Sequence, residues 1–119
     1  MDAMMEKARE VGRMISQTDE FKALKRANER LSDDREAVEK LNRLSDLQGS
    51  ITQALQRGQE PSEEEREEYE NLANALQGMT AYQGVVAAQS NFERLMGRVN
   101  DEISKGIEAG EQSRIILSS

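Results

Sequence analysis

Residues 69–107 read YENLANALQGMTAYQGVVAAQSNFERLMGRVNDEISKGI, and this stretch decides the fold. Its large apolar side chains recur mostly every three or four residues, which is the spacing of one face of an α-helix. This apolar stripe consists of Tyr69, Leu72, Leu76, Met79, Tyr82, Val86, Phe92, Met96, Val99, Ile103 and Ile107. Gly78 is the one strong helix breaker within it, so the second half of the chain is predicted to form one long helix or two nearly continuous ones.

The apolar stripe must be covered by other apolar groups. The chain has 119 residues but only two Phe, two Tyr and no Trp, so it has little bulky material for that purpose. Packing inside the chain accounts for part of the stripe, and packing against another copy or another protein is predicted for the rest. The predicted interface with a dimer mate or a partner includes Tyr82, Val86, Phe92, Met96, Val99 and Ile103.

The composition predicts one all-α domain over residues 1–119. Hydrophobic residues make up 36% and charged residues 33% of the chain, which is compatible with folding. Strong helix formers dominate, and no run of alternating apolar and polar residues is flanked by hairpin turns. We therefore expect an antiparallel helical bundle or hairpin of about five helices with a long C-terminal helical half.

The absence of certain residue types excludes most site chemistry. Cys and His are both missing, which removes disulfides, thiolate nucleophiles, the usual zinc sites and imidazole acid–base catalysis. A carboxylate-based metalloenzyme is disfavoured by the lack of His. We expect no catalytic, cofactor or metal site. No apolar run has the length of a signal peptide or a membrane span, so a cytoplasmic protein without membrane contact is expected.

The first half of the chain shows three amphipathic helical segments. Residues 3–16 form the first, and Thr18 is predicted to cap the second, at about 19–31. Ser32, followed by two aspartates, is predicted to cap the third, which continues to about Arg57 and is ended by Gly58.

A loop and an acidic cluster follow. Pro61 breaks the third helix, and Ser62 with Glu65 has the spacing of a capping box for a fourth. The formal net charge is −7, and most of the excess comes from the acidic cluster, which contains Glu60, Glu63, Glu64, Glu65, Glu67, Glu68 and Glu70. Its carboxylates favour the positive end of the fourth helix, and an acidic docking surface is the less favoured interpretation.

Three further features have a structural and a functional interpretation. Gly84 either lets another helix approach closely or is tolerated on a solvated face. The tail, residues 110–119, either docks through Ile115–Leu117 or is disordered. The carboxylates at positions 33, 34 and 36 are expected to cap a helix, because the loop spacing and turn Gly of a Ca²⁺ site are missing.

A basic group on the second predicted helix is the only feature suited to RNA. It consists of Lys22, Lys25, Arg26 and Arg30. Acidic residues lie among these cations and no aromatic stacking platform accompanies them, so direct nucleic-acid binding is not expected.

The order of these segments resembles the YlbF/YmcA/YheA family of small helical bacterial regulators. The resemblance covers about residues 3–108 and depends on four motifs in sequence. These are Ala8, Val11, Ile15 and Ser16 followed by Phe21; the apolar series Val38, Leu41, Leu44, Leu47, Ile51 and Leu55; the stretch Gln56-Arg57-Gly58-Gln59-Glu60-Pro61-Ser62; and Tyr82 before Phe92, Leu95, Met96, Val99 and Ile103.

The resemblance implies a cytoplasmic, non-enzymatic regulator that forms homo- or hetero-oligomers. For the YlbF and YmcA branches it also implies sister chains and ribonuclease-associated proteins as partners, with effects on RNA processing, competence, biofilm formation and sporulation. Cysteines linked to iron–sulfur clusters in that regulatory complex have no counterpart here. The alternative hypothesis is a small helical secretion-system substrate or its chaperone, although the chain lacks the Trp-x-Gly turn of the best-known group of these.

Overall fold

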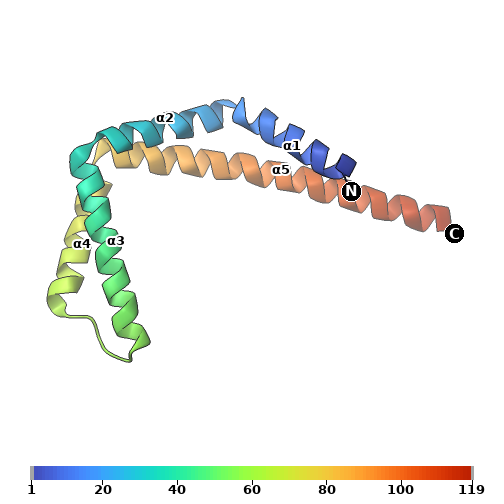
Figure 1. Cartoon of the computed structure of the whole chain (residues 1–119). Helices are drawn as coiled ribbons and strands as arrows, with labels where there is room; N and C mark the ends of the chain where they lie inside the picture. Colours follow the sequence, from blue (N-terminus) through green and yellow to red (C-terminus); the bar gives the residue numbers. More distant parts are fainter. Residues whose placement is uncertain (1, 119) are drawn as a thin grey trace.

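The computed structural model describes residues 2–118, with side chains described up to Gln112. Within that range the chain forms five helices and no strand, as predicted. The helices are α1 (Asp2–Ser16), α2 (Asp19–Asp33), α3 (Arg35–Gln56), α4 (Glu63–Gln77) and α5 (Thr80–Ser118). Figure 1 shows two arms that meet at a corner: α3 and α4 form an antiparallel hairpin, and α2 packs along the first part of α5.

Short polar side chains begin the helices close to the predicted positions. The Thr18 hydroxyl accepts a hydrogen bond from the Phe21 amide at 3.2 Å, and the Ser62 hydroxyl accepts one from the Glu65 amide at 3.2 Å. The prediction that Ser32 caps the third helix is wrong. α2 continues through Ser32 to Asp33, and the Asp34 carboxylate accepts from the Ala37 amide at 3.1 Å. The Asp34 carboxylate stabilises the start of α3 in two ways: it accepts a hydrogen bond from a free amide, and its negative charge lies near the positive end of the helix dipole.

Gly58 ends α3, as predicted. Its φ is +73°, the left-handed region in which an L side chain is strained. The Gly58 amide donates to the Leu55 carbonyl at 3.1 Å, and the Gln59 amide donates to the Ala54 carbonyl at 2.8 Å. These two bonds form a Schellman motif, so the last carbonyls of α3 are satisfied.

Alanine substitution at two glycines of the same arm is expected to have opposite effects. Gly58→Ala should lower the free energy of unfolding by about 1 kcal/mol, because the new side chain strains the left-handed backbone. Gly49→Ala should raise it by about 0.5–1 kcal/mol, because Gly49 lies inside α3 and an added Cβ meets nothing within 4 Å. Urea unfolding followed by circular dichroism measures both. A loss of stability in both variants would contradict this description of α3.

The core is small for a chain of this length. Among the described side chains, the buried apolar residues are Leu47 and Leu76 with three alanines, Ala27, Ala37 and Ala88. The radius of gyration is 21.5 Å, whereas a compact domain of 119 residues would have about 13–14 Å. The accessible surface is 9550 Å², about 3,000 Å² more than a compact monomer of this mass exposes. The chain is therefore extended, and it leaves several large hydrophobic side chains exposed, among them Met4, Met14, Leu55 and Ile107.

Candidate interaction surfaces

The seam between α2 and α5 buries the middle of the apolar stripe. The rings of Phe21 and Phe92 lie with their centroids 5.9 Å apart at an interplanar angle of 59°. Such tilted aromatic pairs are favourable beyond the area they bury. At the edge of the seam, the Arg98 guanidinium lies 3.5 Å from a Glu20 carboxylate oxygen. The seam therefore fixes α2 along the first half of α5.

The six residues of the predicted interface fall into two groups. Tyr82, Phe92, Met96 and Val99 are half-buried, and Val86 and Ile103 are exposed. Phe92 is committed to the seam, and the side chains four and seven residues further along α5 lie on the same side of the helix. Packing inside the chain thus accounts for part of the stripe. The interface with another chain stays a prediction, carried by the exposed members.

Beyond the seam, the apolar stripe continues without cover. Every residue from 100 to 112 of α5 is exposed, including Ile103 and Ile107. We call residues 100–118 of α5 the overhang. Ile103 and Ile107 lie on the same helical face as Phe92 and Val99, because the spacings of four, seven, eleven and fifteen residues correspond to almost whole turns.

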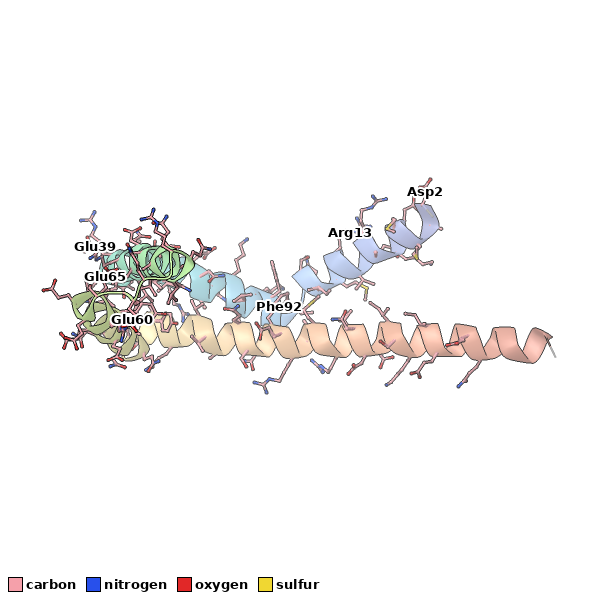
Figure 2. The ribbon with its side chains drawn as sticks, turned by 90° about the horizontal axis from the view of Figure 1, so that it is seen from below. Asp2, Arg13, Glu39, Glu60, Glu65 and Phe92 are labelled. Atoms are coloured by element: carbon pink, nitrogen blue, oxygen red, sulfur yellow. The ribbon has the colours of Figure 1, made fainter. Side chains whose placement is uncertain are left out.

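Helix α1 carries a second uncovered apolar face. None of its residues is buried, and its exposed large hydrophobic side chains are Met4, Met5, Val11 and Met14. Figure 2 shows α1 rising away from α5 toward Asp2, with Arg13 pointing away from α5. Met4 and Val11 lie on the side of α1 opposite Arg13, since they are nine and two residues from it. The apolar face of α1 is therefore turned toward the overhang.

We call these two walls together the open V: the apolar face of α1, with Met4 and Val11, and the overhang, with Ile103 and Ile107. The interface predicted from the sequence contains neither α1 nor Ile107. The sequence does contain a signal for the apolar face of α1, because Met4, Ala8, Val11 and Ile15 recur with helical spacing. The pattern does not say whether such a face is covered within the chain, and only the structure shows that it is not.

The acidic cluster on α4 is partly engaged within the hairpin. Two Arg43 nitrogens donate to the two Glu68 carboxylate oxygens at 2.6 and 2.9 Å. This bidentate hydrogen bonding to Arg43 lowers the pKa of Glu68 below its ordinary value. Glu60 lies 3.7 Å from Arg66, and Glu63, Glu64 and Glu65 occupy the first turn of α4. These contacts agree with a role in helix formation, and the docking interpretation of the acidic cluster stays open.

The remaining candidate sites are surface features. No group of three acidic residues within the described part of the chain is arranged to hold a metal ion. An added Cβ at Gly84 meets nothing within 4 Å, so no close helix approach occurs there within the single chain. The four cations of the basic group are exposed on α2. Among the described residues, no helix is both long and apolar enough to cross a membrane. The side chains of Ile115–Leu117, predicted either to dock or to be disordered, lie outside those described.

Comparisons with known proteins agree with this fold. A UPF0342 protein of Limosilactobacillus fermentum is 30% identical over 97 residues, covering 82% of this chain and 81% of the relative. A UPF0342 protein of Lactobacillus acidophilus is 28% identical over 93 residues, covering 78% and 80%. The crystal structure of Bacillus subtilis RicA in complex with RicF contains a chain that superposes with a TM-score of 0.75 at 16% identity, covering 89% of this chain and 94% of that one.

The likeness to that solved structure covers most of the chain and shows that the two share a fold. The decisive match is to a family model described as "Control of competence regulator ComK, YlbF/YmcA", which aligns with residues 4–108. That range includes most of α1, the whole hairpin and α5 as far as residue 108, so it ends within the overhang. The chain belongs to the YlbF/YmcA family.

Proposed function

We propose that this protein is a non-enzymatic cytoplasmic adaptor that regulates RNA processing, and through it competence, by helix-mediated assembly with chains of its own family. The observation that carries the proposal is the open V, an apolar surface on two helices that the single chain leaves exposed. Exposed apolar faces that extend over two neighbouring helices mark sites of association with other proteins. The family's description as regulators of competence supports the regulatory role.

The kind of partner is suggested by a relative. The solved RicA structure contains RicF, a second protein bound to RicA. We extend this to the present chain as part of the proposal: its assembly places a helical surface where a ribonuclease-associated protein can bind. The chain contributes shape and apolar area, and its carboxylates act in helix capping and ion pairing.

The test is affinity capture of the tagged chain from its own cells, with nuclease treatment before elution and mass spectrometry of the eluate. The measurement is paired with transcript half-lives in a deletion strain. Recovery of a family chain or a ribonuclease after nuclease treatment, together with changed half-lives, is expected. Recovery of secretion components, or of the chain alone with unchanged half-lives, would contradict the proposal and favour the secretion-system alternative.

A further inference from the structure

We propose that the exposed methionines of α1 form a reversible oxidation site, and that their sulfoxides weaken binding at the open V. The site consists of Met4, Met5 and Met14. This inference rests on the proposed function, because it adds a means of control to the assembly on which that function depends. Hydrogen peroxide or a similar two-electron oxidant is the reagent, and thiol-dependent methionine sulfoxide reductases reverse the change.

The methionines of the chain are concentrated at α1. Residues 1–14 contain four of the six, and the other two are Met79 and Met96. Among the described residues, four large hydrophobic side chains are exposed on α1, and three of them are methionines. None of the four exposed on the other helices is a methionine. On α1, therefore, the apolar surface offered to a partner consists largely of thioethers.

The sulfur atoms of α1 are accessible to an oxidant in the folded chain. Met4, Met5 and Met14 are 60%, 50% and 70% exposed, whereas Met79 and Met96 are half-buried. The chain has no Cys, so no thiol of its own consumes the oxidant first. Because reaction requires contact between the oxidant and the sulfur, exposure predicts that α1 is oxidised before Met79 and Met96.

Oxidation replaces an apolar group with a polar one on the binding face. Peroxide transfers one oxygen atom: its O–O bond breaks, an S–O bond forms, the sulfur loses two electrons and water leaves. The product is a sulfoxide. Met4 lies on the face of α1 that is turned toward the overhang, and Met5 and Met14 lie on the two flanks of that face. A partner that covers α1 must then bury polar sulfoxide groups, which lowers its affinity.

The same change leaves the fold of the single chain intact. No residue of α1 is buried, so a sulfoxide there displaces no core side chain. Met96 differs, because it is half-buried on the side of α5 that packs on α2. Oxidation restricted to α1 therefore acts on association, whereas oxidation of Met96 acts on the seam and on stability.

Oxidation kinetics of the purified full-length chain test the site itself. The chain is treated with hydrogen peroxide, and sulfoxide at each methionine is followed by peptide mapping and mass spectrometry. Met4, Met5 and Met14 should react at least about threefold faster than Met79 and Met96. The two methionine sulfoxide reductases, one for each sulfoxide epimer, should restore the methionines of α1 with dithiothreitol as the reductant. The midpoint of thermal unfolding should not change at the dose that oxidises α1 alone.

Capture of family chains tests the effect on binding. The tagged chain is immobilised, treated with peroxide at that dose, washed, and only then exposed to nuclease-treated lysate, so that the partner is never oxidised. A triple variant, with Leu at positions 4, 5 and 14, keeps the apolar volume of α1 but not its sulfur. The matched control, Met79→Leu with Met96→Leu, keeps the sulfur of α1.

Wild type and the matched control should recover about tenfold less of the family chain after peroxide, since sulfoxides must be buried on binding. Treatment with the reductases should restore recovery, and the triple variant should recover the same amount with and without peroxide. Equal losses in wild type and the triple variant would overturn the inference. Oxidation of α1 that is no faster than oxidation of Met79 and Met96 would overturn it as well.

The outcome separates this inference from the proposed function. If the untreated chain captures a family chain and oxidation of α1 does not reduce the amount, the adaptor function stands and the control by oxidation falls. If the untreated chain captures no family chain, the proposed function falls and the effect on binding falls with it. The oxidation rates and their reversal then still decide whether α1 is a selective oxidation site.

Discussion

Leu76→Ala is expected to lower the free energy of unfolding by about 2–5 kcal/mol, the range for truncating a fully buried leucine. Leu76 is 1% exposed and is the largest fully buried side chain among those described. It lies near the end of α4, close to the corner where the two arms meet (Figure 1). A chain of this length has a total stability of about 6–18 kcal/mol, and here the core contains few large side chains. The loss is therefore a large share of the total.

Urea unfolding of Leu76→Ala, followed by circular dichroism at several protein concentrations, measures this effect. Leu55→Ala is the control, because it deletes the same atoms from a side chain that is 62% exposed. The control should change the unfolding free energy by less than about 0.5 kcal/mol. Equal losses in the two variants would contradict the assignment of Leu76 to the core.

Phe92→Glu is expected to open the seam between α2 and α5, lowering the free energy of unfolding by about 3–5 kcal/mol. The substitution removes the ring that packs on Phe21 and places a carboxylate in a half-buried apolar position. From the sequence alone this variant is expected either to dissociate an oligomer or to unfold the chain. The contact with Phe21 favours unfolding, since α2 then loses its anchor on α5.

Val86→Glu on the same helix separates these effects. Val86 is 50% exposed, so the single chain should tolerate the charge with little loss of stability. Thermal unfolding and sedimentation are measured for both variants. A folded Phe92→Glu protein with unchanged assembly would contradict both the seam and the predicted interface.

Local sequence signals were sufficient for the helices and most of their ends. Thr18, Gly58 and Ser62 stop or start helices through bonds to their own neighbours, and such bonds depend on few other residues. The predicted cap at Ser32 failed because two aspartates follow it. Any of the three can accept a hydrogen bond from a first-turn amide, and the local pattern does not rank them.

The division of the apolar stripe required the structure. Phe92 and Ile103 have the same helical phase and similar apolar character, yet one packs on Phe21 and the other is exposed. The difference arises because α2 begins at Asp19 and covers the part of α5 that contains Phe92, whereas α1, before Thr18, runs away from the part of α5 that contains Ile103 (Figure 2). Periodicity reports which face of a helix is apolar, but it does not report how far along that face the neighbouring helix extends.

Hydrogen exchange of α1 and the overhang, measured as a function of protein concentration, tests the central claim most directly. A lone chain leaves both segments exposed to solvent, and helices without a packed face open easily. If chains of this protein assemble through the open V, the amides of α1 and residues 100–112 should become protected as the protein concentration rises, while those of the α3–α4 hairpin stay unchanged. If the amides of α1 exchange at the same rate at every protein concentration, whether that rate is fast or slow, the result would contradict assembly through this surface.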